Sequence, residues 1–295
     1  MAGLKEIRSR ITSVNSTRQI TSAMKMVSAA KLRRAQEAVE RMHPYAEKLR
    51  ELLENVSASL DDTEGVYSQQ REVKKVLLVA ITSNRGLSGA FNNNIIKTVK
   101  TMINDDYMDA DVSVLTVGKK AHDAFKRTPN YSDEGQKLEP NEIFDDLSFD
   151  NVKAIAEPIM EQFADQKYDR VVLVYNHFIN AAMQQVQKEQ FLPIKPPKED
   201  SSQDKKSASS DYIFEPNKED IVRELIPKSL KIQFYKAILD SWASEHGARM
   251  TAMHKATDNA GDLLKDLKLT YNKARQTSIT NEILEIVSGA EALNG

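Results

Sequence analysis

The chain has 295 residues, which is enough for one or two domains. Its net charge of −2 and pI near 6.3 give no overall sign of a nucleic-acid or lipid partner. It contains no cysteine, which excludes disulfides, thiolate metal sites and cysteine nucleophiles. It also lacks the apolar segment of a secretory signal and the roughly 20 apolar residues that span a bilayer. We therefore expect a soluble protein, or one that reaches a membrane only through partners.

Residues 1–60 are predicted to form one very long helix of the coiled-coil type. With heptad position a at residue 4 and position d at residue 7, twelve of the sixteen a and d positions are apolar. The series is Leu4, Ile7, Ile11, Val14, Arg18, Thr21, Lys25, Ser28, Leu32, Ala35, Val39, Met42, Ala46, Leu49, Leu53 and Val56.

The heptad register is expected to fail within residues 18–28. There Ile20, Met24 and Val27 form an apolar row that is displaced by one position. An undistorted helix drifts by about 20° per heptad, so such a slip is expected where supercoiling relaxes. Further along, Pro44 should kink or distort the helix.

The middle of the chain, residues 71–212, is predicted to be an α/β domain. Strands alternate with helices, which favours a mostly parallel, Rossmann-like sheet. Strands are expected at residues 73–83, 109–118 and 170–178, with an edge strand at 182–194, and helices up to about residue 102 and at 119–127 and 151–166. Residues 196–210 are polar and rich in Pro and Ser, which predicts a mobile loop.

Residues 217–295 are predicted to contain the second coiled-coil helix. No proline occurs from Lys228 to about Ala292, and Pro227 should mark the start of the helix or a bend near it. Apolar residues recur at helical spacing, at Ile232, Tyr235, Leu239, Trp242, Met250, Met253, Ala256, Leu263, Leu264, Leu267, Tyr271, Ile279, Ile283, Ile286 and Val287. So long a helix must bury this stripe against a partner. We therefore expect an antiparallel coiled coil of the two terminal helices.

The segment SNRGLSGA lies between a predicted strand and a predicted helix, where a phosphate cradle could form. It has neither the spacing and lysine of a P-loop nor a GxGxxG pattern. The favoured interpretation is a tight turn in which Gly86 and Gly89 relieve backbone strain.

The sequence predicts no catalytic centre, no metal site and no cofactor. The five histidines are scattered; His246 and His254 lie eight apart on one helix and could share a metal, but packed or solvated side chains are favoured. No serine stands in a GxSxG elbow, and the paired acids lie in loop-like contexts. These residues do not assemble the roles that an enzyme needs.

The first helix has an uneven charge. Up to residue 36 it carries one acid, Glu6, and eight basic residues: Lys5, Arg8, Arg10, Arg18, Lys25, Lys31, Arg33 and Arg34. A solvated face usually mixes signs and gains i,i+4 pairs, so this excess predicts an acidic partner. Nucleic acid is one candidate, but aromatic stacking residues are missing, and a protein sleeve with acidic loops fits better.

Two long segments of the chain resemble one known family. The opening AGLKEIRSRITSVNSTRQITSAMKMVSAAKLRRAQ and the closing ATDNAGDLLKDLKLTYNKARQTSITNEILEIVSGAEAL resemble the gamma-subunit family of F-type, H⁺-transporting ATP synthases, bacterial type. The segment ITSNRGLSGAFN resembles the turn in that family's middle domain. The family pattern I/V-T-x-E-x-x-D/E-x-x-x-G-A is filled by Ile279, Thr280, Glu282, Glu285, Gly289 and Ala290. The resemblance covers essentially the whole chain.

The resemblance implies a non-catalytic, central-stalk rotor subunit. The paired helices would turn inside a ring of three alpha and three beta subunits, coupling proton flow to ATP synthesis or hydrolysis at the beta sites. The α/β domain would contact the epsilon subunit and the ring of c subunits. A chain that starts at MAGLKEIRS points to the cytoplasmic face of a bacterial inner membrane, or to a mature organelle form.

The resemblance also implies which residues meet partners. Met24 and Lys25 match a region that faces a beta-subunit lever, and the basic residues Arg8, Arg33 and Arg34 would face acidic beta loops. Arg275, Gln276 and Thr280 match polar positions at another beta loop, and Glu282 and Glu285 would be structural or coupling residues. Each could also be ordinary surface chemistry. Two other functional classes stay open: a stand-alone α/β nucleotide-binding protein, and a coiled-coil scaffold that binds nucleic acid.

Overall fold

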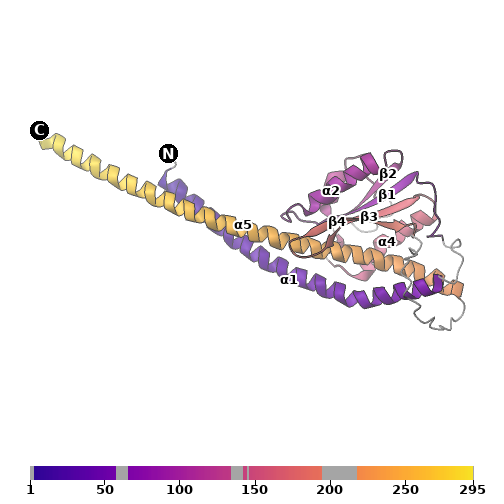
Figure 1. The fold of residues 1–295 in the computed structure, drawn as a ribbon. Helices are drawn as coiled ribbons and strands as arrows, with labels where there is room; N and C mark the ends of the chain where they lie inside the picture. Colours follow the sequence, from indigo (N-terminus) through magenta and orange to yellow (C-terminus); the bar gives the residue numbers. More distant parts are fainter. Residues whose placement is uncertain (1–2, 58–65, 134–141, 145, 195–217, 295) are drawn as a thin grey trace, which may run out of the picture. The chain divides into compact units, whose positions relative to one another are not determined.

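A computed structural model describes residues 3–57, 66–133, 142–144, 146–194 and 218–294 of the chain (Figure 1). The chain divides into two compact units, Met1–Ala29 with Arg249–Gly295 and Ala30–Ala248. We call them the helical unit and the α/β unit. The predicted domain boundaries stay predictions, and the predicted loop at 196–210 lies outside the described residues.

The two terminal helices are confirmed, and both run from one unit into the other. Helix α1 is Leu4–Ser57, with 54 residues, and it continues through Pro44. Helix α5 is Lys218–Asn294, with 77 residues. Pro227 lies inside α5 and so does not mark its start; the other alternative, a bend near this proline, stays a prediction. An internal proline costs about 3 kcal/mol. Burial of Leu230 and Phe234 just beyond it offsets that cost.

The sheet of the α/β unit has four strands in the order β2-β1-β3-β4. Strand β1 (Lys75–Ile81) pairs in parallel with β2 (Asp111–Val117) and with β3 (Arg170–Phe178). Strand β4 (Gln184–Leu192) pairs antiparallel with β3 at the edge. The mostly parallel sheet with an edge strand at 182–194 is therefore confirmed. Its hydrophobic pattern fits: β1 is buried almost throughout, whereas β4 is largely uncovered.

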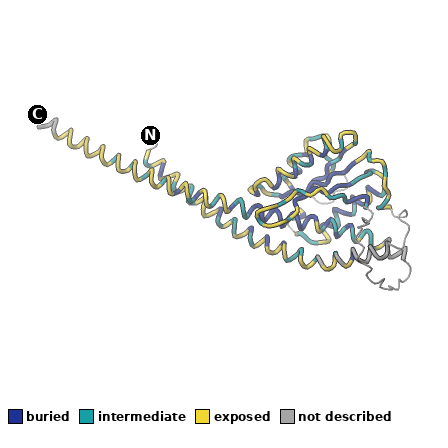
Figure 2. The backbone as a smooth tube through the Cα atoms, in the orientation of Figure 1, coloured by how far each residue is buried: buried dark blue, intermediate teal, exposed yellow. Residues whose placement is uncertain are grey.

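Helices cover both faces of this sheet (Figure 1). Helix α2 (Phe91–Thr101), continued by a π-helical turn at Met102–Asp106, and α3 (Lys119–Phe125) pack on one face. Helix α4 (Phe149–Ala164) and part of α5 pack on the other. From α5, Leu230, Phe234, Ala237 and Ile238 enter that second core. A 3₁₀ turn at Glu142–Phe144 adds Ile143 to it. Figure 2 shows the strands as the most buried part of this unit.

Gly118, directly after β2, makes a close approach that the sequence did not predict. Its φ is +98°, and a Cβ placed there would lie 2.1 Å from the carbonyl oxygen of Thr82. The amide of Thr82 donates to Val117 O at 2.8 Å, so the ends of β1 and β2 are held together at this point. Only glycine can combine this backbone angle with this contact.

We expect Gly118→Ala to lower the free energy of unfolding by roughly 2–4 kcal/mol, because both the backbone angle and the Thr82 carbonyl oppose the new methyl group. Urea unfolding followed by the fluorescence of Trp242, the one tryptophan, measures the change. Gly86→Ala is the matched control, since its nearest atom would be Lys120 Cε at 3.9 Å. Equal unfolding midpoints for the two variants would contradict this account.

Candidate partner-contact surface

In the helical unit α1 and α5 pair antiparallel, as predicted. Thr257 Oγ1 donates to Thr21 Oγ1 at 2.8 Å, and Lys25 Nζ donates to His254 Nδ1 at 3.3 Å. Residue numbers therefore rise along one helix and fall along the other. Ile7 on α1 and Met253 on α5 are among the side chains buried in this unit.

The predicted break in the heptad register of α1 was wrong. Among the residues of α1 whose burial the structure describes, the buried ones all occupy a and d positions: Ile7, Thr21, Ser28, Leu32, Ala35 and Leu49. Polar Thr21 and Ser28 thus maintain the heptad register through residues 18–28. Their hydroxyls are satisfied, because Thr21 Oγ1 donates to Arg18 O at 3.1 Å and Ser28 Oγ to Met24 O at 2.8 Å. Burying a hydroxyl costs little free energy when it is hydrogen-bonded, and the small side chains of Thr and Ser let the two helices pack closely.

The apolar row that the sequence assigned to a relaxed supercoil instead lies mainly on the outside of α1. Ile20 is 59% and Val27 57% exposed, whereas Met24 of the same row is half-buried; nearby Met26, outside the row, is 66% exposed. Leu263 and Leu269 on α5 are also exposed. A row of large apolar side chains on an otherwise polar helix pair indicates a surface that a partner covers. The displaced apolar row in the sequence is the sign of this partner surface, but periodicity alone cannot tell such a surface from packing between the two helices.

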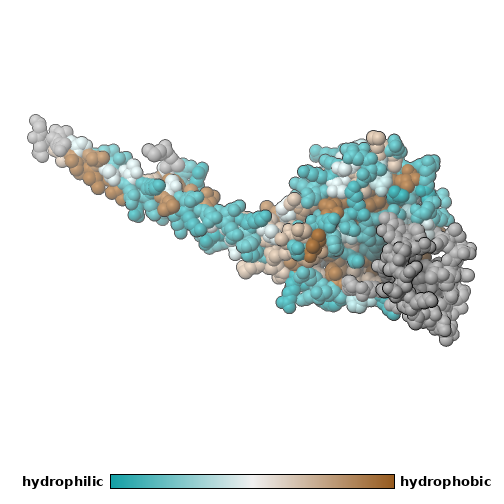
Figure 3. All heavy atoms as spheres, viewed as in Figure 1, coloured by the Kyte–Doolittle hydropathy of each residue, from teal (hydrophilic) through white to brown (hydrophobic). Residues whose placement is uncertain are grey.

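The end of α5 is a second exposed apolar surface. Every residue from 279 to 290 is exposed (Figure 2). The Thr21–Thr257 contact places the start of α1 opposite about residue 274, so α5 continues beyond its partner. Five large apolar residues lie there, Ile279, Ile283, Leu284, Ile286 and Val287, and Figure 3 shows them as a brown stretch near the C-terminus. The expectation that Ile279, Ile283, Ile286 and Val287 belong to the buried stripe was wrong.

Eight of the ten predicted contact residues lie in the helical unit. Six are exposed: Arg8, Arg275, Gln276, Thr280, Glu282 and Glu285. Met24 and Lys25 are half-buried beside the paired helices. Thr280 Oγ1 donates to the carbonyl of Gln276 at 2.9 Å, and Ser278 Oγ to Glu282 Oε1 at 3.4 Å. The polar positions of α5 therefore share the exposed segment with the apolar ones.

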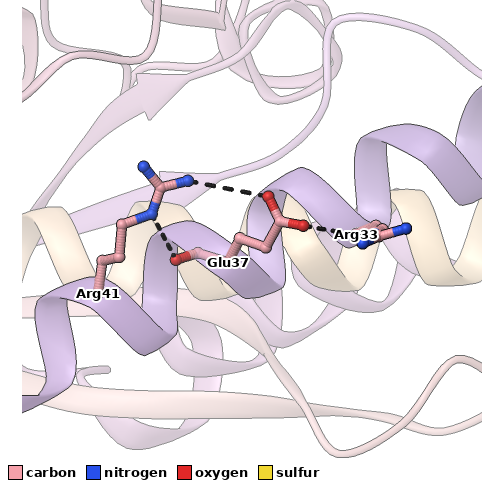
Figure 4. A network of polar contacts seen from close by, with 3 residues as sticks. All are labelled: Arg33, Glu37 and Arg41. Atoms are coloured by element: carbon pink, nitrogen blue, oxygen red, sulfur yellow. Dashed lines mark hydrogen bonds and ion pairs between the residues drawn. The ribbon is translucent and has the colours of Figure 1, made fainter.

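Arg33 and Arg34 are exposed residues of α1 in the α/β unit. Arg33 Nε donates to Glu37 Oε1 at 3.0 Å, and Arg41 Nε donates to Glu37 O at 3.2 Å (Figure 4). Arg10 likewise lies 3.6 Å from Glu6. The basic face therefore does use i,i+4 pairs, contrary to the expectation. Such exposed pairs contribute only about 0.3–0.5 kcal/mol each, so Arg33 can exchange Glu37 for another acid at little cost.

The model of one protein family, described as ATP synthase, matches residues 3–293. An ATP synthase gamma chain from Christiangramia forsetii is 62% identical, and one from Geobacter metallireducens 44%, each aligned over the full length of both chains. The chain belongs to the gamma chain family of ATP synthase. A chain from the rotor of the Euglena gracilis mitochondrial ATP synthase has 25% identity and a TM-score of 0.62, covering 94% of this chain and 98% of its own. This member of the gamma chain family is therefore a central-stalk rotor subunit, and the resemblance of its two ends is confirmed.

The turn after β1 in this gamma chain is filled by its own side chains. Asn92 Oδ1 accepts from the Ser83 amide at 3.0 Å, and Asn92 Nδ2 donates to Ser83 Oγ at 2.9 Å. Gly89 has the positive φ expected of it, +61°, but Gly86 does not; the exposed Leu87 takes the other left-handed position, at +64°. This network supports the interpretation of SNRGLSGA as a turn.

The two α5 histidines have separate surroundings. His246 is buried with its ring edge-on to Trp242, whereas His254 is exposed and lies 3.4 Å from Asp258. Among the described residues, no three His, Asp or Glu side chains converge as metal ligands. Within the same residues, no helix is both long and apolar enough to cross a bilayer. A polar hollow of about 390 Å³ lies beside β4, lined mainly by residues 187–191 and Gln233.

Neighbouring substitutions in α1 test the register. We expect Ser28→Leu to destabilise the chain by about 1–3 kcal/mol, because the larger side chain must enter the buried seam. Val27→Ser should change stability by less than about 0.5 kcal/mol, since Val27 faces solvent. Thermal unfolding followed by far-UV circular dichroism measures both. If Val27→Ser proved the more damaging change, Val27 and not Ser28 would have to face the partner helix.

Proposed function

We propose that the helical unit is the part of this rotor that turns inside a ring of three alpha and three beta subunits. The α/β unit would bind the epsilon subunit and the c-subunit ring, so that proton flow drives ATP synthesis and ATP hydrolysis drives the reverse. The observation that carries the proposal is the uncovered apolar surface of the helical unit. It is supported by the family match and by similar chains from a rotor and from a central stalk with its c-ring.

The chemistry of this surface suits rotation. Apolar contact excludes water without fixing a direction, so Ile283 and Ile286 can slide past successive partners at little cost. Charged contacts have a preferred geometry and therefore depend on the angle of the shaft. Small residues, Ala23, Ser28, Ala29 and Ala30, keep the pair slim where it would enter the ring.

We assign the angle-dependent contacts to ten residues. Arg8, Met24, Lys25, Arg33 and Arg34 would meet the acidic lever region of the beta subunits. Arg275, Gln276 and Thr280 would meet a second beta loop, and Glu282 and Glu285 would stabilise that contact. Each beta subunit would favour one shaft orientation, which is the differential binding that shifts a conformational equilibrium.

The chain would be non-catalytic by itself and would lie at the cytoplasmic face of a bacterial inner membrane, attached through partners. The proposal is tested by purifying the isolated chain and by pulling it down with alpha and beta subunits. We expect co-purification of both subunits and no ATP turnover by the chain alone. Robust ATP hydrolysis without partners would instead favour a stand-alone nucleotide-binding protein.

Reversing three basic residues tests the charged contacts. We expect Arg8→Glu, Arg33→Glu and Arg34→Glu together to reduce ATP-driven proton pumping per ATP roughly fivefold in the assembled enzyme, since acidic partners would be repelled. The thermal stability of the free chain should hardly change, because all three side chains are exposed.

The control reverses three exposed basic residues of the α/β unit, Lys97, Lys100 and Arg127. This triple variant carries the same change in net charge. Normal pumping by the Arg8, Arg33 and Arg34 variant, or an equal loss in both variants, would count against these contacts.

A further inference from the structure

A row of three residues on α5, Gln233, Asp240 and Gly247, lies against strands β3 and β4 and the turn that joins them. They are seven residues apart, so they share one face of the helix over about 21 Å. All three belong to the α/β unit. We call them the contact row. The contact row consists of two polar residues and a glycine, whereas neighbouring faces of α5 carry large apolar side chains.

Asp240 holds the end of β3. The amide of Phe178 donates to Asp240 Oδ1 at 2.8 Å, and His177 Nδ1 contacts Asp240 Oδ2. Asp240 is only 9% exposed. Burying a carboxylate is costly unless several donors meet it, and here each oxygen has one. The two contacts fix both the position and the direction of this carboxylate.

Gln233 joins α5 to the middle of the β3–β4 pair. Gln233 Nε2 donates to Glu189 Oε1 at 2.7 Å, and Tyr175 Oη donates to Glu189 Oε2 at 2.6 Å. Burial raises the pKa of Tyr175, and the charges of Glu189 and Asp240 raise it further, so the phenol stays protonated as a donor. Gln233 of α5 and Tyr175 of β3 thus both bind the Glu189 carboxylate of β4.

Gly247 allows the turn between β3 and β4 to touch α5. A Cβ at this position would lie 3.1 Å from Phe178 Cε2 and 3.2 Å from Ala181 Cα. These contacts are tighter than most Cβ contacts, so a side chain here would require Phe178 or Ala181 to shift by a few tenths of an ångström. The third point of the row is therefore held by close backbone approach instead of hydrogen bonds.

Outside the contact row, Lys231 Nζ of α5 donates to Glu157 Oε1 of α4 at 2.6 Å, and the contact with the sheet is mainly apolar packing. This packing involves Leu230, Phe234, Ala237 and Ile238. Apolar burial is proportional to area and is not directional, so small rolling or sliding of the helix changes it little. Two directional contacts and one close backbone approach, spread along 21 Å or so of helix, resist both motions.

We propose that the contact row fixes α5 against rotation relative to the sheet, so that torque passes between the α/β domain and the helix. Asp240 is the central positioning residue. This inference rests on the proposed rotary function. It assigns the stiffness of the junction to three positions on α5 instead of to the apolar core.

The first test compares Asp240→Asn with Asp240→Ala in the assembled enzyme, in inverted membrane vesicles. Asn keeps an acceptor for the Phe178 amide, whereas Ala keeps none. We expect protons pumped per ATP hydrolysed to fall roughly threefold with Ala and less with Asn, while ATP hydrolysis itself persists. Hydrogen exchange of the Phe178 amide should quicken in the same order. Lys236→Ala, at an exposed position of α5, is the control.

A reversible cross-link provides the second test. The chain contains no cysteine, and a Cβ at position 247 would lie 3.2 Å from Ala181 Cα, so a cysteine pair can be introduced at these two neighbouring positions. In the double variant Ala181→Cys and Gly247→Cys, the reduced form should pump poorly because the new side chains push the turn away. Oxidation should restore the number of protons pumped per ATP hydrolysed, and reduction of the disulfide should lower this number again.

The outcomes separate the two proposals. If the unmodified enzyme pumps and the Asp240 variants pump equally well per ATP, the contact row has no role in torque. The same conclusion follows if oxidation of the cysteine pair leaves the ratio unchanged. If the unmodified assembled enzyme shows no ATP-driven pumping at all, the rotary function itself is overturned. Should the cysteine variant fail to assemble, the two Asp240 variants still decide.

Discussion

The burial of one stretch of α5 inside the α/β unit is the constraint on which the rest of the structure depends. Residues 237–241 and 243–248 are all buried, so this helix is a central element of the unit and not an appendage. The same helix then continues for more than 40 residues into the helical unit. A continuous α-helix is held by hydrogen bonds along its whole length, and a force applied at one end is carried to the other.

The molecule uses opposite chemistry on the two parts of α5. Within the α/β unit the helix buries several polar side chains, and Asp240 among them is held by the Phe178 amide and by His177. Such contacts specify one arrangement more strictly than apolar packing does. At its C-terminal end the helix exposes apolar side chains, which can contribute to binding a partner without fixing the orientation of the helix. A part that must hold its own domain firmly and yet move against its partners needs this division.

Periodicity in the sequence was enough for both long helices, and alternation of strands and helices for the mostly parallel sheet, because these patterns are local. It failed where tertiary contact decides. Thr21 and Ser28 are polar residues in a buried seam, and only the partner helix shows that their neighbours Ile20 and Val27 face outward. Gly118 and Gly247 are glycines because of backbone atoms 36 or more residues away. The family resemblance identified the rotor, but the exposure of Arg8 or Thr280 does not by itself say what each contacts.

The two helices of the helical unit differ in length and in sequence, so the unit is asymmetric about its long axis. Up to the start of α1 the cross-section is two dissimilar helices, one with a basic excess; beyond it α5 continues with every residue from 279 to 290 exposed. Two unlike helices side by side have no rotational symmetry. If three equivalent subunits surround them, as proposed, each must meet a different surface at any moment. Differences in contact energy of about 1.4 kcal/mol change the balance between two conformations tenfold. Modest differences in exposed side chains are therefore sufficient to hold three identical partners in three different states, provided that the shaft cannot turn within its own domain.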